Sequence, residues 1–226
     1  MPIVIDMQGA QTESRFRGIG RYTMAFAQAV VRNKGEHKVF LALSGLFPHT
    51  IEPIRAAFEG LLPQENIRVW HAPGPVNDED QNNSARREVA ELVREAFLAS
   101  LCPDIVHVCS LFEGYVDDAV TSIGRFDNRT PVTATLYDLI PMLNSDKYLK
   151  PNPGYATYYE RKLSSLKNAK QLFAISEYAK HEGLDCLVVD ASHIVNVSTA
   201  IGSEFKPIEV DELAKTALLS KVGTKK

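Results

Sequence analysis

The sequence predicts an α/β fold with a doubly wound, mostly parallel sheet of about seven strands and helices on both faces. Short runs that are apolar almost throughout alternate with longer stretches of helical period, which is the pattern of βα units. Strands of this kind, buried on both faces, are typical of parallel sheets. Ligands of such sheets bind beyond the carboxyl ends of the strands, so the loops after strands one, four, five and six are the first places to search for a site.

Strands and helices are expected in regular alternation. The expected strands are residues 3–7, 38–43, 67–70, 105–109, 132–136, 171–175 and 194–197. The expected helices are residues 19–32, 84–101, 155–166 and 177–187. No Gly-, Ser- or Pro-rich linker divides the first 200 residues, so we expect one domain over residues 1–207. Residues 208–226 are expected to form a linker or tail with one polar helix or a frayed end.

The expected helix over residues 84–101 carries apolar and charged residues in alternation. Its arginines would suit a membrane-surface helix, but glutamates are interleaved with them. We therefore interpret it as a helix that packs an apolar face on the core and turns its charged face to water. The expected core-facing residues are Val89, Leu92, Val93, Ala96 and Phe97.

Composition places this chain of 226 residues, 45% hydrophobic and 23% charged, among ordinary globular proteins. A net charge of -3, with no Lys/Arg run longer than a pair, gives no electrostatic footprint for nucleic acid. Three cysteines without CxxC spacing indicate neither a disulfide framework nor a zinc site. No apolar run approaches the length of a membrane span and the amino terminus does not resemble a signal peptide, so a cytoplasmic protein is expected.

The loop after the first strand contains Gly18 and Gly20 and leads directly into a helix. Glycines allow close backbone approach, and a helix amino terminus offers free amides and a positive dipole end to a phosphate. A dinucleotide-binding enzyme would place a third glycine where Thr23 stands and an acid at the end of the second strand, where Ser44 stands. These departures disfavour an NAD-dependent dehydrogenase or epimerase, which is kept as an alternative.

Other candidates follow the later strands. Tyr137 and Asp138 come directly after the fifth strand, where they could bind a sugar hydroxyl, although Asp138 could equally cap the next turn. Ser176, after the sixth strand, is a good helix N-cap, and this structural role explains it better than a binding role. Glu113 could reach the same edge, although an acid in a loop is usually only solvated. His107 lies inside an apolar strand and is more typical of a core histidine than of a ligand.

Four segments in this order resemble the family 4 (group 1) retaining glycosyltransferases of the GT-B fold, which include bacterial mannosyl- and glucosyltransferases of polysaccharide assembly. The segments are RGIGRYTMAF (17–26), TLYDLIPML (135–143), LKNAKQLFAISEYAK (166–180) and GSEFKP (202–207). The resemblance implies that residues 1–207 form the Rossmann-like, acceptor-side half of a GT-B enzyme. Residues 208–226 would lead toward a C-terminal donor-binding domain that this sequence does not include.

The resemblance also implies roles for single residues. The residues expected to contact the donor are Gly18, Gly20, Tyr137 and Asp138. The residues expected to shape the acceptor site are Arg21, Tyr22, Glu113 and Ser176, together with the loop over residues 143–155. Tyr137 stands where many members have a histidine that contacts the donor sugar, so that contact departs from the family pattern. No catalytic residue and no metal site is expected in this half.

By resemblance, the whole enzyme would move a hexose from a nucleotide diphosphate sugar to an acceptor hydroxyl with retention and without an obligatory cofactor. The expected partners are the donor-binding domain and a saccharide or lipid-linked saccharide acceptor, reached by peripheral contact with the inner face of a membrane. Glu204 and Glu212 have the E-x7-E spacing of the donor domain, but no strand-to-helix loop surrounds them, and we interpret this match as chance. The lone chain is expected to be inactive; the alternative is a non-catalytic binding or scaffolding subunit of a split enzyme.

Overall fold

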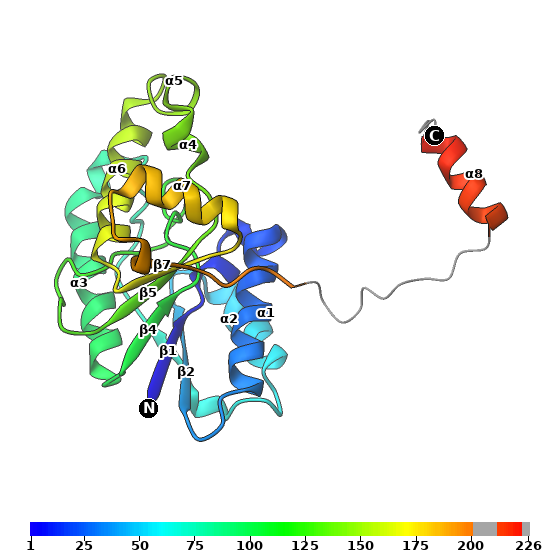
Figure 1. Ribbon diagram of the computed structural model, residues 1–226. Helices are drawn as coiled ribbons and strands as arrows, with labels where there is room; N and C mark the ends of the chain where they lie inside the picture. Colours follow the sequence, from blue (N-terminus) through cyan, green and yellow to red (C-terminus); the bar gives the residue numbers. More distant parts are fainter. Residues whose placement is uncertain (201–211, 223–226) are drawn as a thin grey trace.

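The computed structural model describes residues 1–200 and 212–222 and contains a seven-stranded sheet (Figure 1). The strand order is β3-β2-β1-β4-β5-β6-β7, and all the pairings are parallel. The strands are β1 Pro2–Asp6, β2 Lys38–Ser44, β3 Ile67–Trp70, β4 Ile105–Val108, β5 Val132–Leu136, β6 Gln171–Ala174 and β7 Ile194–Asn196. The predicted doubly wound α/β fold is confirmed, and each predicted strand lies within one residue of its observed ends.

Helices connect successive strands, as the alternation predicts, except between β4 and β5, which residues 109–131 join without a helix. They are α1 Gly18–Arg32, α2 Pro48–Ala57, α3 Ser84–Ser100, α4 Ile140–Leu143, α5 Ser145–Tyr148, α6 Pro153–Asn168, α7 Glu177–Leu187 and α8 Glu212–Val222. The sequence did not predict α2, because Pro53 stands inside it and Pro48 at its start, where proline fits the first turn. The short 3-10 helices η1 Gln8–Ala10 and η2 Glu13–Phe16 lie between β1 and α1.

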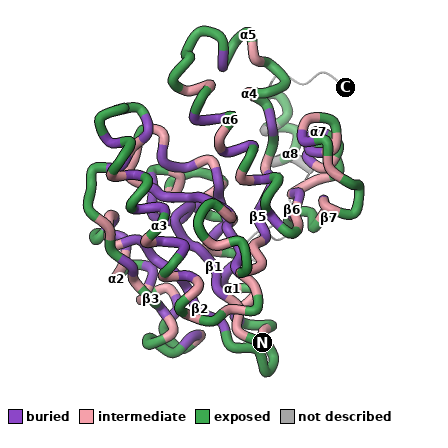
Figure 2. The backbone as a smooth tube through the Cα atoms, turned by 90° about the vertical axis from the view of Figure 1, so that its left-hand side faces the viewer, coloured by how far each residue is buried: buried purple, intermediate pink, exposed green. Residues whose placement is uncertain are grey.

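The two faces of the sheet are covered by different helices (Figure 1). On one face, α1 and α2 bury a cluster that includes Ile5, Leu41 and Phe58. On the other, α3 packs over Val4 and its neighbours at the centre. The same face carries α6 and α7 over β5 to β7, in a cluster whose members include Leu136, Leu166, Leu172, Leu187 and Ile194. The buried backbone in Figure 2 accordingly follows the sheet and the inner sides of these helices.

The predicted inner face of α3 is only partly correct: Val93 and Phe97 pack against the core, but three other residues do not. Val89 and Leu92, expected in the core, are 47% and 46% exposed, and Ala96 is exposed too. Beside its apolar contacts, the helix buries four charged residues that were expected to face water. Its buried residues are Arg87, Ala90, Glu91, Arg94, Glu95 and Leu98.

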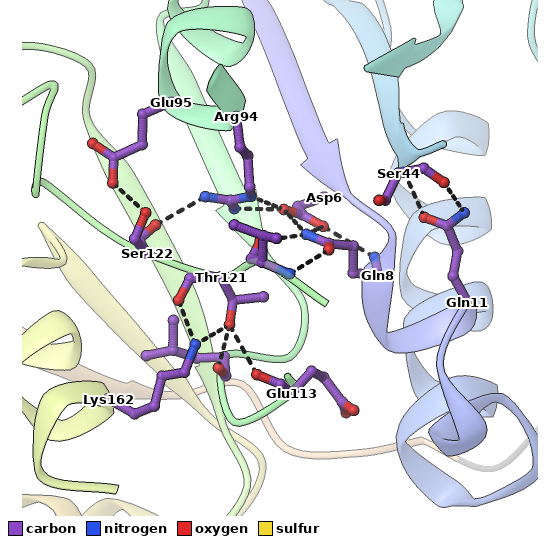
Figure 3. Close-up of polar contacts among 12 residues, drawn as sticks. Asp6, Gln8, Gln11, Ser44, Arg94, Glu95, Glu113, Thr121, Ser122 and Lys162 are labelled. Carbon is purple, nitrogen blue, oxygen red and sulfur yellow. Dashed lines mark hydrogen bonds and ion pairs between the residues drawn. The ribbon is translucent and has the colours of Figure 1, made fainter. Parts of the chain in front are cut away.

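Groups from distant segments of the chain pair with these buried charges. Arg94 donates from Nε to Oδ2 of Asp6 over 2.8 Å, its terminal nitrogen pairs with the same oxygen, and Nη1 reaches the carbonyl of Ser122 at 2.9 Å (Figure 3). Glu95 accepts backbone N–H groups of Phe126 and Asp127 at 2.7 and 2.8 Å. Buried charges are tolerated when they are paired and hydrogen-bonded, which is why this face of α3 can point inward.

Several expectations about the tail lie outside the described residues. These are the domain boundary at residue 207, the GSEFKP segment and Glu204; Glu212 begins α8. Within residues 1–200 and 212–222, no helix is long and apolar enough to cross a membrane.

Candidate functional site

The candidate site lies at the edge of the sheet where the strands have their carboxyl ends. The sheet order places the loops after β1, β4, β5 and β6 side by side at this edge. Every residue that the sequence analysis proposed for binding lies in or directly after one of these four loops. The topology therefore brings the predicted candidates to one edge, as expected for a parallel sheet.

Two buried glutamines fix the loop after β1. The side-chain amide of Gln8 pairs with both backbone groups of Val120, accepting from its N–H at 2.8 Å and donating to its carbonyl at 2.7 Å. Gln11 pairs in the same way with Ser44, at 2.8 and 3.0 Å (Figure 3). Both glutamines are fully buried. Because each amide replaces a backbone partner, this loop is held on one side by the segment after β4 and on the other by the end of β2.

Gly18 and Gly20, both predicted to contact the donor, have different surroundings. A Cβ placed on Gly20 would overlap the backbone of Arg15 and Ser14, so this glycine lets η2 lie directly on α1. A Cβ on Gly18 would meet nothing within 4 Å. The side chain of Arg17, the N-cap residue, makes no hydrogen bond that caps the amino terminus of α1. Gly18 therefore leaves open space at this helix end, whereas Gly20 is required for local packing.

Glu113, predicted to face an acceptor, is 6% exposed. Its two carboxylate oxygens accept hydroxyl hydrogen bonds from Thr12 and Ser110, both at 2.9 Å. Its carbonyl accepts the hydroxyl of Tyr158 at 2.9 Å. Glu113 thus joins the loops after β1 and β4, and its contact with an acceptor stays a prediction.

An aromatic contact joins α1 to the end of β5. Tyr22 and Tyr137 lie edge to face, with ring centroids 5.6 Å apart. The hydroxyl of Tyr137 is buried beside Thr23, and burial is the main cause of the raised pKa of Tyr137. Because this hydroxyl is buried, it does not face the edge as the sequence analysis expected, and donor contact by Tyr137 stays a prediction.

Asp138 is exposed at the same strand end. Its Oδ1 accepts from the N–H of Ile140 at 3.2 Å, so the predicted turn-capping role is confirmed. The adjacent Leu139 N–H donates to the buried carboxylate of Glu182 on α7, at 3.0 Å. Glu182 therefore holds the turn that presents Asp138, a role for which the sequence gives no signal beyond an acid on the inner side of a helix.

The remaining candidates are Ser176 and Arg21. Ser176 caps α7 by accepting from the N–H of Ala179 at 3.1 Å, which confirms its structural role. Arg21 is exposed on the first turns of α1, near the exposed Arg17. Binding by Arg21 and Ser176 stays a prediction.

His107 is confirmed as a core histidine. Its Nδ1 and Nε2 lie 2.8 and 3.0 Å from the hydroxyls of Thr133 and Thr135 on β5, and its ring packs between Phe26 and Phe173. Burial disfavours the imidazolium and lowers the pKa of His107 to about 3. The ring is therefore neutral, with both nitrogens satisfied.

This burial makes stability depend on pH. Unfolding restores a histidine pKa of about 6.5, so the unfolded chain binds more protons between pH 6.5 and 3, and stability is lost as the pH falls through that window. We expect His107 to lower the free energy of unfolding by about 1.4 kcal/mol between pH 7.5 and 5.5. Urea unfolding of wild type and His107→Gln at both pH values measures this change in the free energy of unfolding. Asp117, whose pKa burial raises to about 6, acts with opposite sign in both proteins, so an equal pH dependence of the two would contradict this role.

The described part of the chain contains no group of three His, Cys, Asp or Glu side chains able to hold a metal ion. What the edge offers is an open helix amino terminus, exposed arginines beside it, and an exposed carboxylate two strands away. This combination suits a ligand with an anionic part near α1 and hydroxyl groups near Asp138.

Sequence comparison identifies relatives of the chain. The glycosyltransferase family 4 model matches residues 16–204. The chain is 35% identical to a serotype-specific mannosyltransferase WbdA of Escherichia coli over 210 residues, which cover 92% of this chain and 25% of that protein. A second WbdA of Escherichia coli is 32% identical over 184 residues, or 81% of this chain and 22% of that protein. The chain spans about a quarter of the length of these relatives.

Solved structures share the fold at low sequence identity. The UDP-GlcNAc 2-epimerase of Neisseria meningitidis, bound to UDP-GlcNAc, matches with a TM-score of 0.56 and 13% identity, over 87% of this chain and 46% of that one. A putative UDP-N-acetylglucosamine 2-epimerase of Listeria monocytogenes matches with a TM-score of 0.52 and 13% identity, over 85% of this chain and 44% of that one. These matches show the fold alone.

Proposed function

Because this chain belongs to glycosyltransferase family 4, we propose that it is the acceptor-binding half of a GT-B enzyme that transfers a hexose from a nucleotide diphosphate sugar to an acceptor hydroxyl, with retention at the anomeric carbon. The relatives named mannosyltransferases support a hexose as the transferred group. We propose a saccharide, free or lipid-linked, as the acceptor. A lipid-linked acceptor would bring the protein to a membrane surface by peripheral contact.

The observation that carries this proposal is the open amino terminus of α1. The first N–H groups of a helix have no partner within the helix, and the dipole favours an anion there. Gly18 leaves the approach to these groups open, and the exposed Arg17 and Arg21 add positive charge. A diphosphate leaving group gains negative charge as the glycosidic bond breaks, so fixed amides and cations at this position would stabilise the transition state.

The residues next to α1 at this edge suit the sugar part of the donor. The contact between Tyr22 and Tyr137 links the proposed diphosphate site to the end of β5, where Asp138 is exposed. We assign Asp138 to a hydroxyl of the donor hexose and Tyr137 to contact through its ring. The donor nucleotide would be held mainly by a C-terminal domain, and half of a site excludes water poorly, so we propose that this chain alone transfers no sugar.

A transfer assay tests the proposal. The chain, alone and joined to a donor-binding domain, is incubated with GDP-, UDP- and dTDP-hexoses and a mannose-terminated oligosaccharide. We expect transfer only from the joined form, with the anomeric configuration of the product, read by NMR, equal to that of the donor. Transfer by the lone chain would contradict the half-site role, an inverted product would contradict retention, and no transfer from any donor would contradict the proposed function.

A further inference from the structure

Two tyrosines form a partly exposed surface beside Asp138. Tyr115 comes from the loop after β4 and Tyr155 from the first turn of α6. Their rings meet edge to face, with centroids 5.0 Å apart. We call this surface, bordered by Asn152 and Asp138, the tyrosine rim. It joins the loop after β4 to the start of α6, at the end of the segment 143–155 that was expected to shape the acceptor site.

The tyrosine rim rests on a rigid base. Below it, Tyr158 is 1% exposed and packs against both tyrosines, with centroids 5.2 Å from Tyr115 and 5.8 Å from Tyr155. The Tyr158 hydroxyl is fixed on the carbonyl of Glu113. A ring that is held from below loses little conformational freedom when a ligand covers its upper side, which favours binding.

Polar groups lie next to the two tyrosines. The exposed Asn152 accepts from the Tyr155 N–H at 3.0 Å and from the Tyr115 hydroxyl at 3.3 Å, which aligns both tyrosines. Asp138 lies near enough for its negative charge, after burial, to contribute to the raised pKa of Tyr155. The rim therefore combines aromatic surface, neutral hydrogen-bonding groups and one negative charge.

We propose that the tyrosine rim is a stacking platform for a neutral pyranose ring of the acceptor saccharide. A pyranose presents C–H groups on its faces and hydroxyls around its edge, so it can cover Tyr155 while its hydroxyls bind Asn152 and the tyrosine hydroxyls. A purely apolar ligand would leave these polar groups unpaired, and an anionic sugar would be repelled by Asp138. This inference rests on the proposed function and specifies which surface holds the acceptor.

Binding of α-linked mannotriose to the full chain, followed by saturation-transfer NMR, tests the platform. We expect Tyr155→Ala to weaken binding about tenfold, because the stacking surface is lost, and Tyr155→Phe to change it less than about threefold. The matched control is Phe126→Ala, which removes an exposed ring from the part of the same loop that lies beside the last residue of α6, at the opposite end of that helix from Tyr155. Thermal unfolding of each variant verifies that it is folded.

Three outcomes would overturn the platform: no binding by wild type, unchanged binding by folded Tyr155→Ala, or an equal loss in Phe126→Ala. A transfer assay with the joined enzyme separates this failure from failure of the proposed function. We expect Tyr155→Ala to raise the acceptor KM about tenfold and leave the donor KM unchanged. Transfer with an unchanged acceptor KM refutes the platform alone, whereas mannotriose binding without transfer by wild type refutes the transferase function alone.

Discussion

Replacing Arg94 by alanine is expected to lower the free energy of unfolding by about 3–5 kcal/mol, the largest effect on stability that we expect from a single substitution. Arg94 and Asp6 are 1% and 2% exposed, and their ion pair joins α3 to the end of β1. Removing the guanidinium leaves the Asp6 carboxylate buried without a counter-charge and the Ser122 carbonyl without its donor. Urea unfolding followed by far-ultraviolet circular dichroism measures the change.

The same helix offers a control for this substitution. Arg86, two turns earlier, donates to the carbonyl of Pro75 from a partly exposed position. Arg86→Ala should cost less than about 1 kcal/mol, because water replaces the lost partner. If Arg94→Ala costs no more than Arg86→Ala, the Asp6 carboxylate is reached by water after the substitution and the pair is not required for folding.

Gly18→Val is expected to lower kcat/KM for hexose transfer by about 100-fold in the joined enzyme while leaving the fold intact. The new side chain would enter the space that lies open at the amino terminus of α1 and would displace the donor diphosphate, and small displacements of a reacting group cost about this factor. Steady-state kinetics with the nucleotide sugar varied, together with a thermal unfolding curve, measures both effects.

Gly20→Val, two residues away in the same helix, is the comparison. Its side chain would overlap the backbone of Arg15, so we expect a loss of about 1–3 kcal/mol of stability from forced displacement of η2. The pair therefore separates a ligand-facing glycine from a packing glycine. Full transfer activity in Gly18→Val would contradict the assignment of the diphosphate to this helix end.

Much of the fold could be predicted because it depends on local patterns. The observed strands β3 and β5 have the predicted ends, since short apolar runs with turn residues on both sides have few other solutions in a parallel sheet. The inner face of α3 could not be predicted in this way. Hydropathy assigns Arg94 and Glu95 to water, and their partners, Asp6 for the arginine and the amides of residues 126 and 127 for the glutamate, are brought to them only by the tertiary fold.

The candidate site shows the same division. The rule that ligands bind at the carboxyl ends of parallel strands placed Gly18, Asp138 and Ser176 at one edge from the sequence alone. Which atoms face outward could not be predicted, because it depends on packing. The Tyr137 hydroxyl turns inward, and Gln8, which has no catalytic pattern around it, proves to hold the first loop through the backbone of Val120.

The charged residues on the inner face of α3 change what a family alignment would mean at this helix. In an ordinary amphipathic helix, evolution keeps the apolar positions and lets the charged ones drift. Here the positions free to drift are Val89 and Leu92, which face solvent, while Arg94 and Glu95 are constrained by partners elsewhere in the chain. Selection on this helix should therefore act on pairs of positions, so that a change at Arg94 survives only when Asp6 changes with it.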